Sequence, residues 1–209
     1  MGLMPGSTRP TWLSRLVKAV LLALYRIKGW TIEGEAPTAS KFVILGAPHT
    51  SNWDFIFFLG AINQLGLKPS FMGKLSLFKW PLTRFMYDMG GIPIDRRAKD
   101  QNYVDQVVAA FAKARELALV IAPEGTRGPI KAWRSGFYHI ASGAKVPILP
   151  AWFNIKERRG GIGPAIMPCG DYAIDLKKIA EFYHSVMPNH PKLAVLYAEA
   201  GLTGGTADA

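Results

Sequence analysis

The 209-residue chain has the length of one ordinary domain, with enough sequence for a hydrophobic core and a cleft. Hydrophobic residues make up 49% and charged residues 19%, which excludes a disordered chain and is rather apolar for a freely soluble protein. The formal net charge of +10 suits nucleic acid, anionic lipid or a phosphorylated or CoA-type substrate, so the position of the charge must decide. The one cysteine, Cys169, excludes an internal disulfide and favours a reducing, cytosolic location.

The first predicted element is a helix at residues 11–29, which has a broad apolar face, scattered basic residues and an end near Gly29. Residues 1–30 contain five basic and no acidic residues, so half of the net charge lies there. This pattern favours an amphipathic helix at a membrane interface, and a helix packed on the core is the alternative. Its longest apolar run, residues 19–25, is far shorter than the roughly 20 residues that span a bilayer. We therefore expect no transmembrane helix and no signal peptide.

From residue 40 onward, short apolar runs alternate with amphipathic stretches. Strands are predicted at residues 41–46, 68–73, 92–95, 117–122 and 146–153. Helices are predicted at residues 54–65, 77–87, 101–115, 136–142, 175–186 and 192–200. Residues 156–172 predict an irregular hairpin or cover, and residues 201–209 a flexible tail. The pattern indicates a single α/β domain over residues 1–209, with a largely parallel central sheet flanked by helices.

A histidine and a carboxylate follow the first of these strands. His49 and Asp54 lie five residues apart, in a loop that leads into the next helix. Loops beyond strand ends are where α/β sheets place their sites. A neutral imidazole can take a proton from an alcohol while a carboxylate on its other nitrogen fixes the tautomer. A packed or capping histidine, with Asp54 as an N-cap, is the alternative for this motif taken alone.

Three further motifs follow strands later in the chain. Residues 90–97 end a strand with an acid and two arginines, whose guanidinium groups can bind phosphate, although a solvated loop remains the alternative. Residues 123–127, Pro-Glu-Gly-Thr-Arg, form a turn in which Gly125 permits exposed amides and Arg127 adds positive charge, or else a plain turn. Residues 146–150 form an apolar strand whose two prolines limit regular pairing.

In this order and spacing the four motifs resemble the glycerol-3-phosphate and lysophosphatidic acid acyltransferase family, whose signature begins with H-x-x-x-x-D. The resemblance covers about residues 40–155 and comprises His49 to Asp54, Gly90 to Arg96, Ala122 to Gly128 and Val146 to Pro150. It implies that His49 is the general base and that Asp54 orients it. It also implies that the acceptor's phosphate or polar head is held by Arg96, Glu124, Gly125, Thr126 and Arg127. No metal and no cofactor are implied, and the acyl donor is acyl-CoA or acyl-ACP.

The expected activity is therefore O-acylation of a lysophospholipid, with lysophosphatidic acid as the first candidate, in phospholipid biosynthesis. The expected location is the cytoplasmic face of the inner membrane, with peripheral or monotopic attachment to an anionic surface. Another lyso-lipid, such as a lyso-aminolipid, is an alternative acceptor, and a non-catalytic lipid-binding protein of the same fold is an alternative class. Nucleic acid is not expected as a partner, because half of the net charge of +10 sits on an apolar N-terminal segment and no nucleic-acid motif is recognised.

Overall fold

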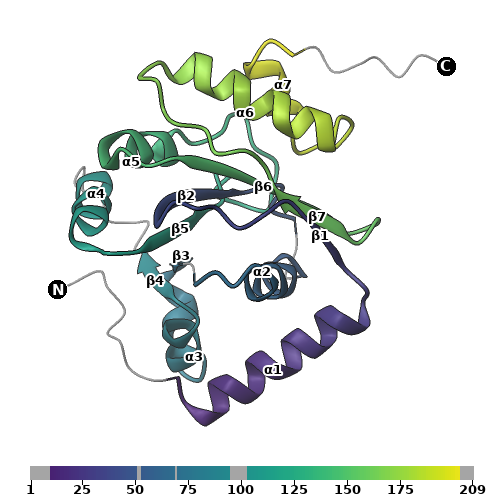
Figure 1. The fold of residues 1–209 in the computed structure, drawn as a ribbon. Helices are drawn as coiled ribbons and strands as arrows, with labels where there is room; N and C mark the ends of the chain where they lie inside the picture. Colours follow the sequence, from purple (N-terminus) through teal and green to yellow (C-terminus); the bar gives the residue numbers. More distant parts are fainter. Residues whose placement is uncertain (1–9, 51–52, 69, 95–102, 203–209) are drawn as a thin grey trace.

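A seven-stranded mixed sheet forms the centre of the part of the chain that the computed structural model describes, residues 10–50, 53–68, 70–94 and 103–202 (Figure 1). The strands are β1 (Thr31–Glu33), β2 (Lys41–Gly46), β3 (Ser70–Lys74), β4 (Gly91–Ile94), β5 (Leu117–Ile121), β6 (Ile148–Asn154) and β7 (Arg159–Ile162). Their order is β1-β7-β6-β2-β5-β3-β4, and every neighbouring pair is parallel except β6 with β7. The prediction of a largely parallel sheet flanked by helices is confirmed.

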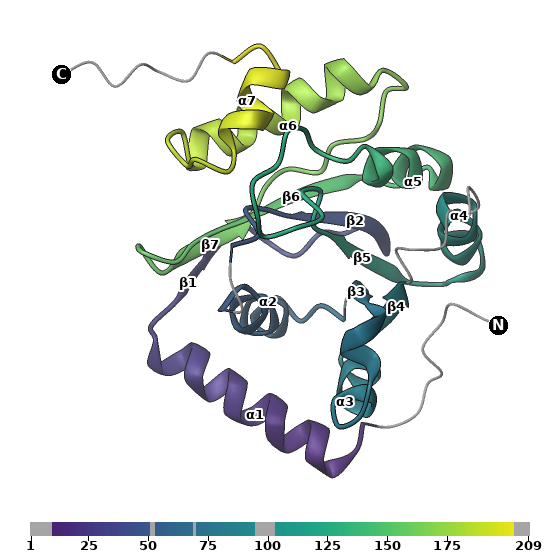
Figure 2. The same ribbon diagram turned by 180° about the vertical axis from the view of Figure 1, so that it is seen from behind.

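Helices cover both faces of this sheet (Figures 1 and 2). One face carries α4 (Tyr103–Lys113), α5 (Gly136–Ala144), α6 (Tyr172–Val186) and α7 (Ala194–Glu199). The other face carries α2 (Trp53–Gln64), with α1 (Trp12–Ile27) outside it and α3 (Thr83–Asp88) beside it. A short 3-10 helix, η1 (Leu75–Phe78), precedes α3.

Alternation along the central strands produces two different faces. On β2, Val43 and Leu45 join the large core under α4–α7, whereas Phe42 and Ile44 belong to a small cluster on the α2 face. β5 repeats the pattern, because successive side chains of a strand point to opposite faces: Leu119 lies in the large core, and Ala118 lies in the small cluster. The cluster on the α2 face therefore contains far fewer buried side chains than the core under α4–α7.

The predicted elements agree with the structure within a few residues, with two exceptions. The predicted helix at residues 77–87 is wrong, because this stretch divides into the end of η1 and a short α3. Pro81 lies between them, and proline lacks the backbone N–H that a continuous helix needs at this position. β1 was not predicted, since three residues are too few for a periodic pattern. The predicted hairpin at residues 156–172 is confirmed in its first part, where β7 pairs antiparallel with β6.

α1 packs against α2 and is hydrogen-bonded to the end of α3. Asp88 accepts hydrogen bonds from the Ser14 hydroxyl at 2.6 Å and from the Thr11 backbone N–H at 3.1 Å, and it pairs with Arg84 at 3.0 Å. Burial by itself raises the pKa of Asp88, but the hydrogen bonds from Ser14 and Thr11 and the charge of Arg84 outweigh it, so the pKa lies below its ordinary value. At the other end of α1, the Tyr25 ring lies directly over Gly60, where any side chain would clash.

The outer side of α1 is apolar and exposed. Its large exposed side chains, with exposed fractions from 37% to 79%, are Trp12, Leu13, Leu16, Val20, Leu24 and Ile27. Trp80, 90% exposed, and Leu82 lie just before α3, to which α1 is bonded. We call these eight residues the α1 surface. None of the helices in the described ranges is both long and apolar enough to cross a membrane.

Candidate active site

The loops that follow β2 and β5 meet at one edge of the sheet. The two strands are parallel neighbours, with Leu45 opposite Ile121, so residues 47–50 and 122–127 leave the sheet side by side. The carboxyl ends of parallel strands are the usual place for a site in an α/β sheet. β4 is parallel to this set and ends at Ile94, but the next predicted site residue, Arg96, lies outside the described residues.

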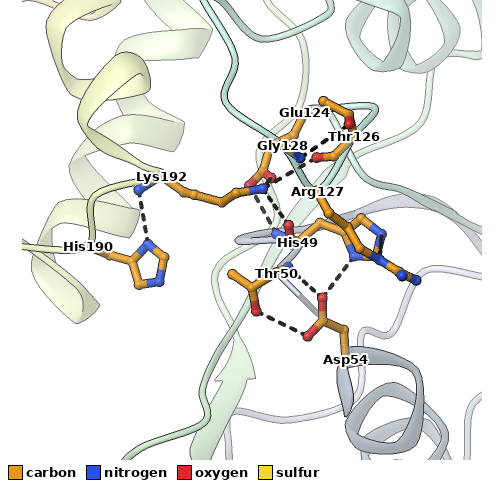
Figure 3. Close-up of polar contacts among 9 residues, drawn as sticks. All are labelled: His49, Thr50, Asp54, Glu124, Thr126, Arg127, Gly128, His190 and Lys192. Carbon is orange, nitrogen blue, oxygen red and sulfur yellow. Dashed lines mark hydrogen bonds and ion pairs between the residues drawn. The ribbon is translucent and has the colours of Figure 1, made fainter. Parts of the chain in front are cut away.

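The His49 imidazole is held by Asp54 in the first turn of α2 (Figure 3). Nδ1 lies 2.9 Å from Asp54 Oδ2, and the same carboxylate accepts the Thr50 backbone N–H at 2.6 Å. Asp54 is buried, whereas 32% of the His49 side chain is exposed. With the Nδ1 proton donated to the carboxylate, Nε2 carries the lone pair and can accept a proton. The expected contact between the two residues is therefore present, while their catalytic roles stay a prediction.

The backbone of His49 is held separately from its side chain. Its N–H donates to Glu124 Oε1 at 3.0 Å, and its carbonyl accepts from Lys192 Nζ at 2.6 Å. Lys192 also pairs with Glu124 Oε2 at 3.0 Å, so lysine and glutamate close a ring of contacts with the His49 backbone N–H and carbonyl. The Glu124 side chain is fully buried, and burial raises its pKa; the hydrogen bonds from Lys192 and His49 and the charge of Lys192 oppose this rise without cancelling it.

The loop that carries Glu124 turns sharply towards His49. Gly125 has a φ of +67°, a backbone conformation that glycine adopts without steric cost, and a side chain there would come within 2.7 Å of Arg134 Nε. The Thr126 carbonyl accepts from Lys192 Nζ at 3.4 Å. Arg127 is exposed, and its Nε donates to His49 Nε2 at 3.4 Å. The turn therefore brings one guanidinium group to the nitrogen of His49 that faces away from Asp54.

A cavity of about 790 Å³ lies between α2 and the sheet and reaches His49. Its polar end contains His49, Asp54, Thr126 and Arg127. The remaining wall is almost entirely apolar and includes Ile44, Phe55, Phe57, Phe58, Ile62 and Val120. Ligand-binding cavities are typically about 300–1,000 Å³ in volume, with mainly apolar walls and a few polar groups. Small residues of the sheet, including Gly46, Ala151 and Gly161, line part of this space.

The structure brings together most of the predicted site residues. His49, Asp54, Gly125, Thr126 and Arg127 all line the cavity. Glu124 lies behind them, with one oxygen bonded to the His49 amide and the other to Lys192. Among the residues that the structure describes, no group of three or more His, Cys, Asp and Glu side chains is placed to hold a metal ion.

Lys192 is the residue that the sequence did not reveal. It falls in the predicted helix at residues 192–200, whereas the structure begins α7 at Ala194 and leaves Lys192 in the preceding loop. The lysine is 143 residues from His49, and no spacing rule connects positions so far apart. Its neighbour His190 has a pKa lowered by burial and by the charges of Lys192 and Lys156.

The model of the family described as Acyltransferase matches residues 30–154 of the chain, which is more than half of its length. The matched segment contains β1 to β6 together with His49, Asp54 and the loop at residues 124–127. It does not contain α6, α7 or Lys192. No curated protein matches the chain.

Proposed function

Because the chain belongs to the acyltransferase family, we propose that it transfers a fatty acyl group from acyl-CoA or acyl-ACP to the hydroxyl of a lysophospholipid. Lysophosphatidic acid is the first acceptor to test, and a lyso-aminolipid is the alternative. The observation that carries the proposal is the apolar cavity of about 790 Å³ with His49 and Asp54 at its polar end. A fatty acyl chain fills such a cavity, and a histidine paired with a carboxylate supports the chemistry of acyl transfer.

His49 acts as the general base in this proposal. Nε2 takes the proton of the acceptor hydroxyl while the hydroxyl oxygen attacks the thioester carbonyl carbon. The tetrahedral intermediate then breaks its C–S bond, and the imidazolium returns the proton to the departing thiolate. Asp54 stabilises the imidazolium through Nδ1, at 2.9 Å in the structure. A positioned general base contributes about 10²- to 10⁴-fold to the rate of such a step.

Arg127 recognises the acceptor's phosphate. A guanidinium group binds phosphate through two parallel hydrogen bonds, which fits an acceptor with a headgroup phosphate. In the structure Arg127 Nε donates to His49 Nε2, the atom that must accept the proton. A phosphate that draws Arg127 away therefore releases Nε2 for the hydroxyl of the same molecule. Arg96 supplies a second phosphate contact by the family resemblance, and Glu124 acts behind the site on the backbone of His49.

The α1 surface attaches the protein to the cytoplasmic face of an anionic inner membrane. Its eight large apolar side chains are exposed, and Arg15, Arg26 and Lys28 are exposed on the same helix. An apolar surface flanked by basic residues lies favourably at the boundary of headgroups and acyl chains. Because α1 packs on α2 and α2 covers the cavity, this attachment brings the cavity near the membrane-held acceptor.

The catalytic proposal is tested with purified protein, a panel of acyl-CoA and acyl-ACP donors, and lysophospholipids with and without a phosphate monoester. We expect release of free thiol together with the diacyl product, identified by mass spectrometry. His49→Ala should lower the rate by about 10²-fold or more. His139→Ala is the matched control, because His139 is an exposed histidine on α5. A wild-type rate in His49→Ala would overturn the mechanism, and no turnover across both panels would favour a non-catalytic lipid-binding protein.

Membrane attachment is tested by flotation with anionic and with uncharged vesicles. Wild-type protein should float with the anionic vesicles, and Leu16→Glu should remain in the soluble fraction. Ile174→Glu is the matched control, since Ile174 is equally exposed on α6 across the sheet from α1. Equal flotation of Leu16→Glu and wild type would contradict this part of the proposal. A DNA shift assay with the same proteins is expected to show no complex at physiological salt.

A further inference from the structure

We propose that Lys192 is a positioning residue for acyl transfer, which holds the loops of His49 and Glu124 in register from a segment that the family match does not cover. This inference rests on the proposed role of His49 as general base. Lys192 touches neither the acyl chain nor the acceptor in the proposal. It acts through the backbone of His49 and the carboxylate of Glu124.

The ammonium group of Lys192 uses three acceptors from two loops (Figure 3). It lies 2.6 Å from the His49 carbonyl, 3.0 Å from Glu124 Oε2 and 3.4 Å from the Thr126 carbonyl. A lysine has three N–H donors, so this set can satisfy all of them. The loop after β2 and the loop after β5 are thereby joined through one cation.

The ring of contacts that Lys192 and Glu124 form with His49 fixes the orientation of the His49 backbone. Glu124 accepts the His49 N–H, and Lys192 donates to the His49 carbonyl, so the polar groups on both sides of the His49 Cα atom are fixed. Asp54 then fixes only the remaining rotation of the imidazole about its side-chain bonds. Loss of the ring would leave the imidazole paired with Asp54 but free to move with its backbone. A displacement of about 1 Å at a reacting group can cost about 10²-fold in rate.

The segment that carries Lys192 is anchored firmly enough for this task. Lys192 stands between Pro191 and Leu193, and Leu193 is completely buried in the large core. The lysine side chain itself is only 18% exposed, and the Glu124 side chain is fully buried. In the same region the Tyr183 hydroxyl of α6 lies 2.8 Å from the carbonyl of Leu45, near the end of β2, and 3.1 Å from that of Ala151, in the middle of β6, so its hydrogen is shared between them. The α6–α7 region therefore contacts the catalytic edge of the sheet at two places.

Removal of one member of the Lys192–Glu124 pair also affects the stability of the fold, so the test must separate stability from positioning. Lys192→Met alone leaves Glu124 buried without its cation and is expected to lower the melting temperature. The double variant Lys192→Met/Glu124→Gln removes both charges and is expected to recover most of that melting temperature. Its kcat should nevertheless stay about 10- to 10²-fold below wild type, with the KM of donor and acceptor changed much less. Glu124→Gln alone completes the cycle, and the two single effects on kcat should not add.

Lys178→Met is the matched control. Lys178 also pairs with a fully buried carboxylate, Asp175, at 2.9 Å, but this pair contacts neither catalytic loop. Its replacement should lower the melting temperature and leave kcat at the wild-type value. A wild-type kcat in the stable double variant would overturn the proposal and leave Lys192 with a purely structural role.

Amide hydrogen exchange without substrate tests the proposal independently of acyl transfer. The peptides covering residues 41–50 and 122–127 should exchange about tenfold faster in the double variant than in wild type. The peptide covering α6 should be unchanged. Unchanged exchange in both loops would overturn the positioning role even if no acceptor is found, whereas absent turnover with faster loop exchange would count against the proposed function alone.

Discussion

The two faces of the central sheet are built from the same strands but differ in what covers them. Under α4–α7, the side chains of β2, β5 and β6 pack into one large core that includes Phe137, Tyr183 and Leu196. On the α2 face, only a small cluster of side chains is buried, and a cavity of about 790 Å³ lies beside it. Because a strand presents its residues alternately, one strand supplies both the packed and the open face.

From this difference we expect stability and activity to respond to side chains on different faces of the sheet. Removal of a side chain from the packed face leaves a void among well-packed neighbours, which lowers the free energy of unfolding. Replacement of a side chain on the open face changes a space that is already available to ligand. Four predictions follow from it, and the largest effect is expected at the polar end of the cavity.

Asp54→Asn is expected to lower the rate of acyl transfer by about 10²- to 10⁴-fold, because the neutral amide cannot stabilise the His49 imidazolium. The amide oxygen can still accept the Thr50 N–H, so the start of α2 should remain folded. Steady-state kinetics with the acceptor found in the panel gives the rate, and circular dichroism gives the fold. A rate within a few-fold of wild type would show that the polar end of the cavity is not the catalytic centre.

Phe137→Ala is expected to lower the free energy of unfolding by about 3–5 kcal/mol, because Phe137 is completely surrounded on the packed face. Phe58→Ala, on the open face, should cost clearly less, since Phe58 is only half-buried and lines the cavity. Urea denaturation measures both changes. The kcat of folded Phe137→Ala should equal that of wild type, and equal stability losses in the two variants would remove the distinction between the faces.

Val120→Phe is expected to reduce turnover of a hexadecanoyl donor by about tenfold, while an octanoyl donor is affected little. Val120 points from β5 into the cavity, so a larger ring there shortens the space for an acyl chain. Val120→Ala serves as the control and should retain the long-chain activity. Equal inhibition for both chain lengths would place the acyl chain elsewhere.

Asp88→Asn is expected to give the smallest effect, a loss of about 1 kcal/mol in the free energy of unfolding at pH 7. The pKa of Asp88 is lower in the folded protein than its ordinary value of about 3.9, so its contribution is complete above that value. The contribution is lost as the pH falls through the folded pKa, below about 4. The stability difference between wild type and variant should therefore shrink from pH 7 to pH 3 in urea titrations, and a constant difference would contradict it.

The sequence predicted the His49–Asp54 pair better than the long-range contacts that hold its loops in place. The H-x-x-x-x-D spacing placed His49 and Asp54 together because both lie within one short connection, and the structure has them 2.9 Å apart. Periodicity also located β2 to β6 within a few residues, whereas β1 was not predicted and β7 lies in the predicted hairpin. The break in the predicted helix at residues 77–87 could have been recognised from Pro81, which lacks the backbone N–H donor that the middle of a helix needs.

The contacts between distant segments could not be predicted in this way. Lys192 reaches a carbonyl 143 residues earlier in the chain, and nothing in its local sequence distinguishes it from an exposed lysine. The buried position of Glu124 is also invisible locally, because a glutamate after a strand usually faces solvent or substrate. Its carboxylate pairs with Lys192, so both positions depend on the same long-range contact.

The contacts of Lys192 and Tyr183 have a consequence for anyone who divides or recombines this protein. A fragment that stops at residue 154 would keep His49, Asp54 and the 124–127 turn. It would lose both the cation that joins their loops and the phenol that contacts the carbonyls of β2 and β6. Such a fragment would retain the motif residues without the contacts that hold their loops together. A chimaera that exchanges the C-terminal helices must therefore carry a lysine donor and a buried hydroxyl at these two places, and the smallest transplantable unit extends at least through Leu193.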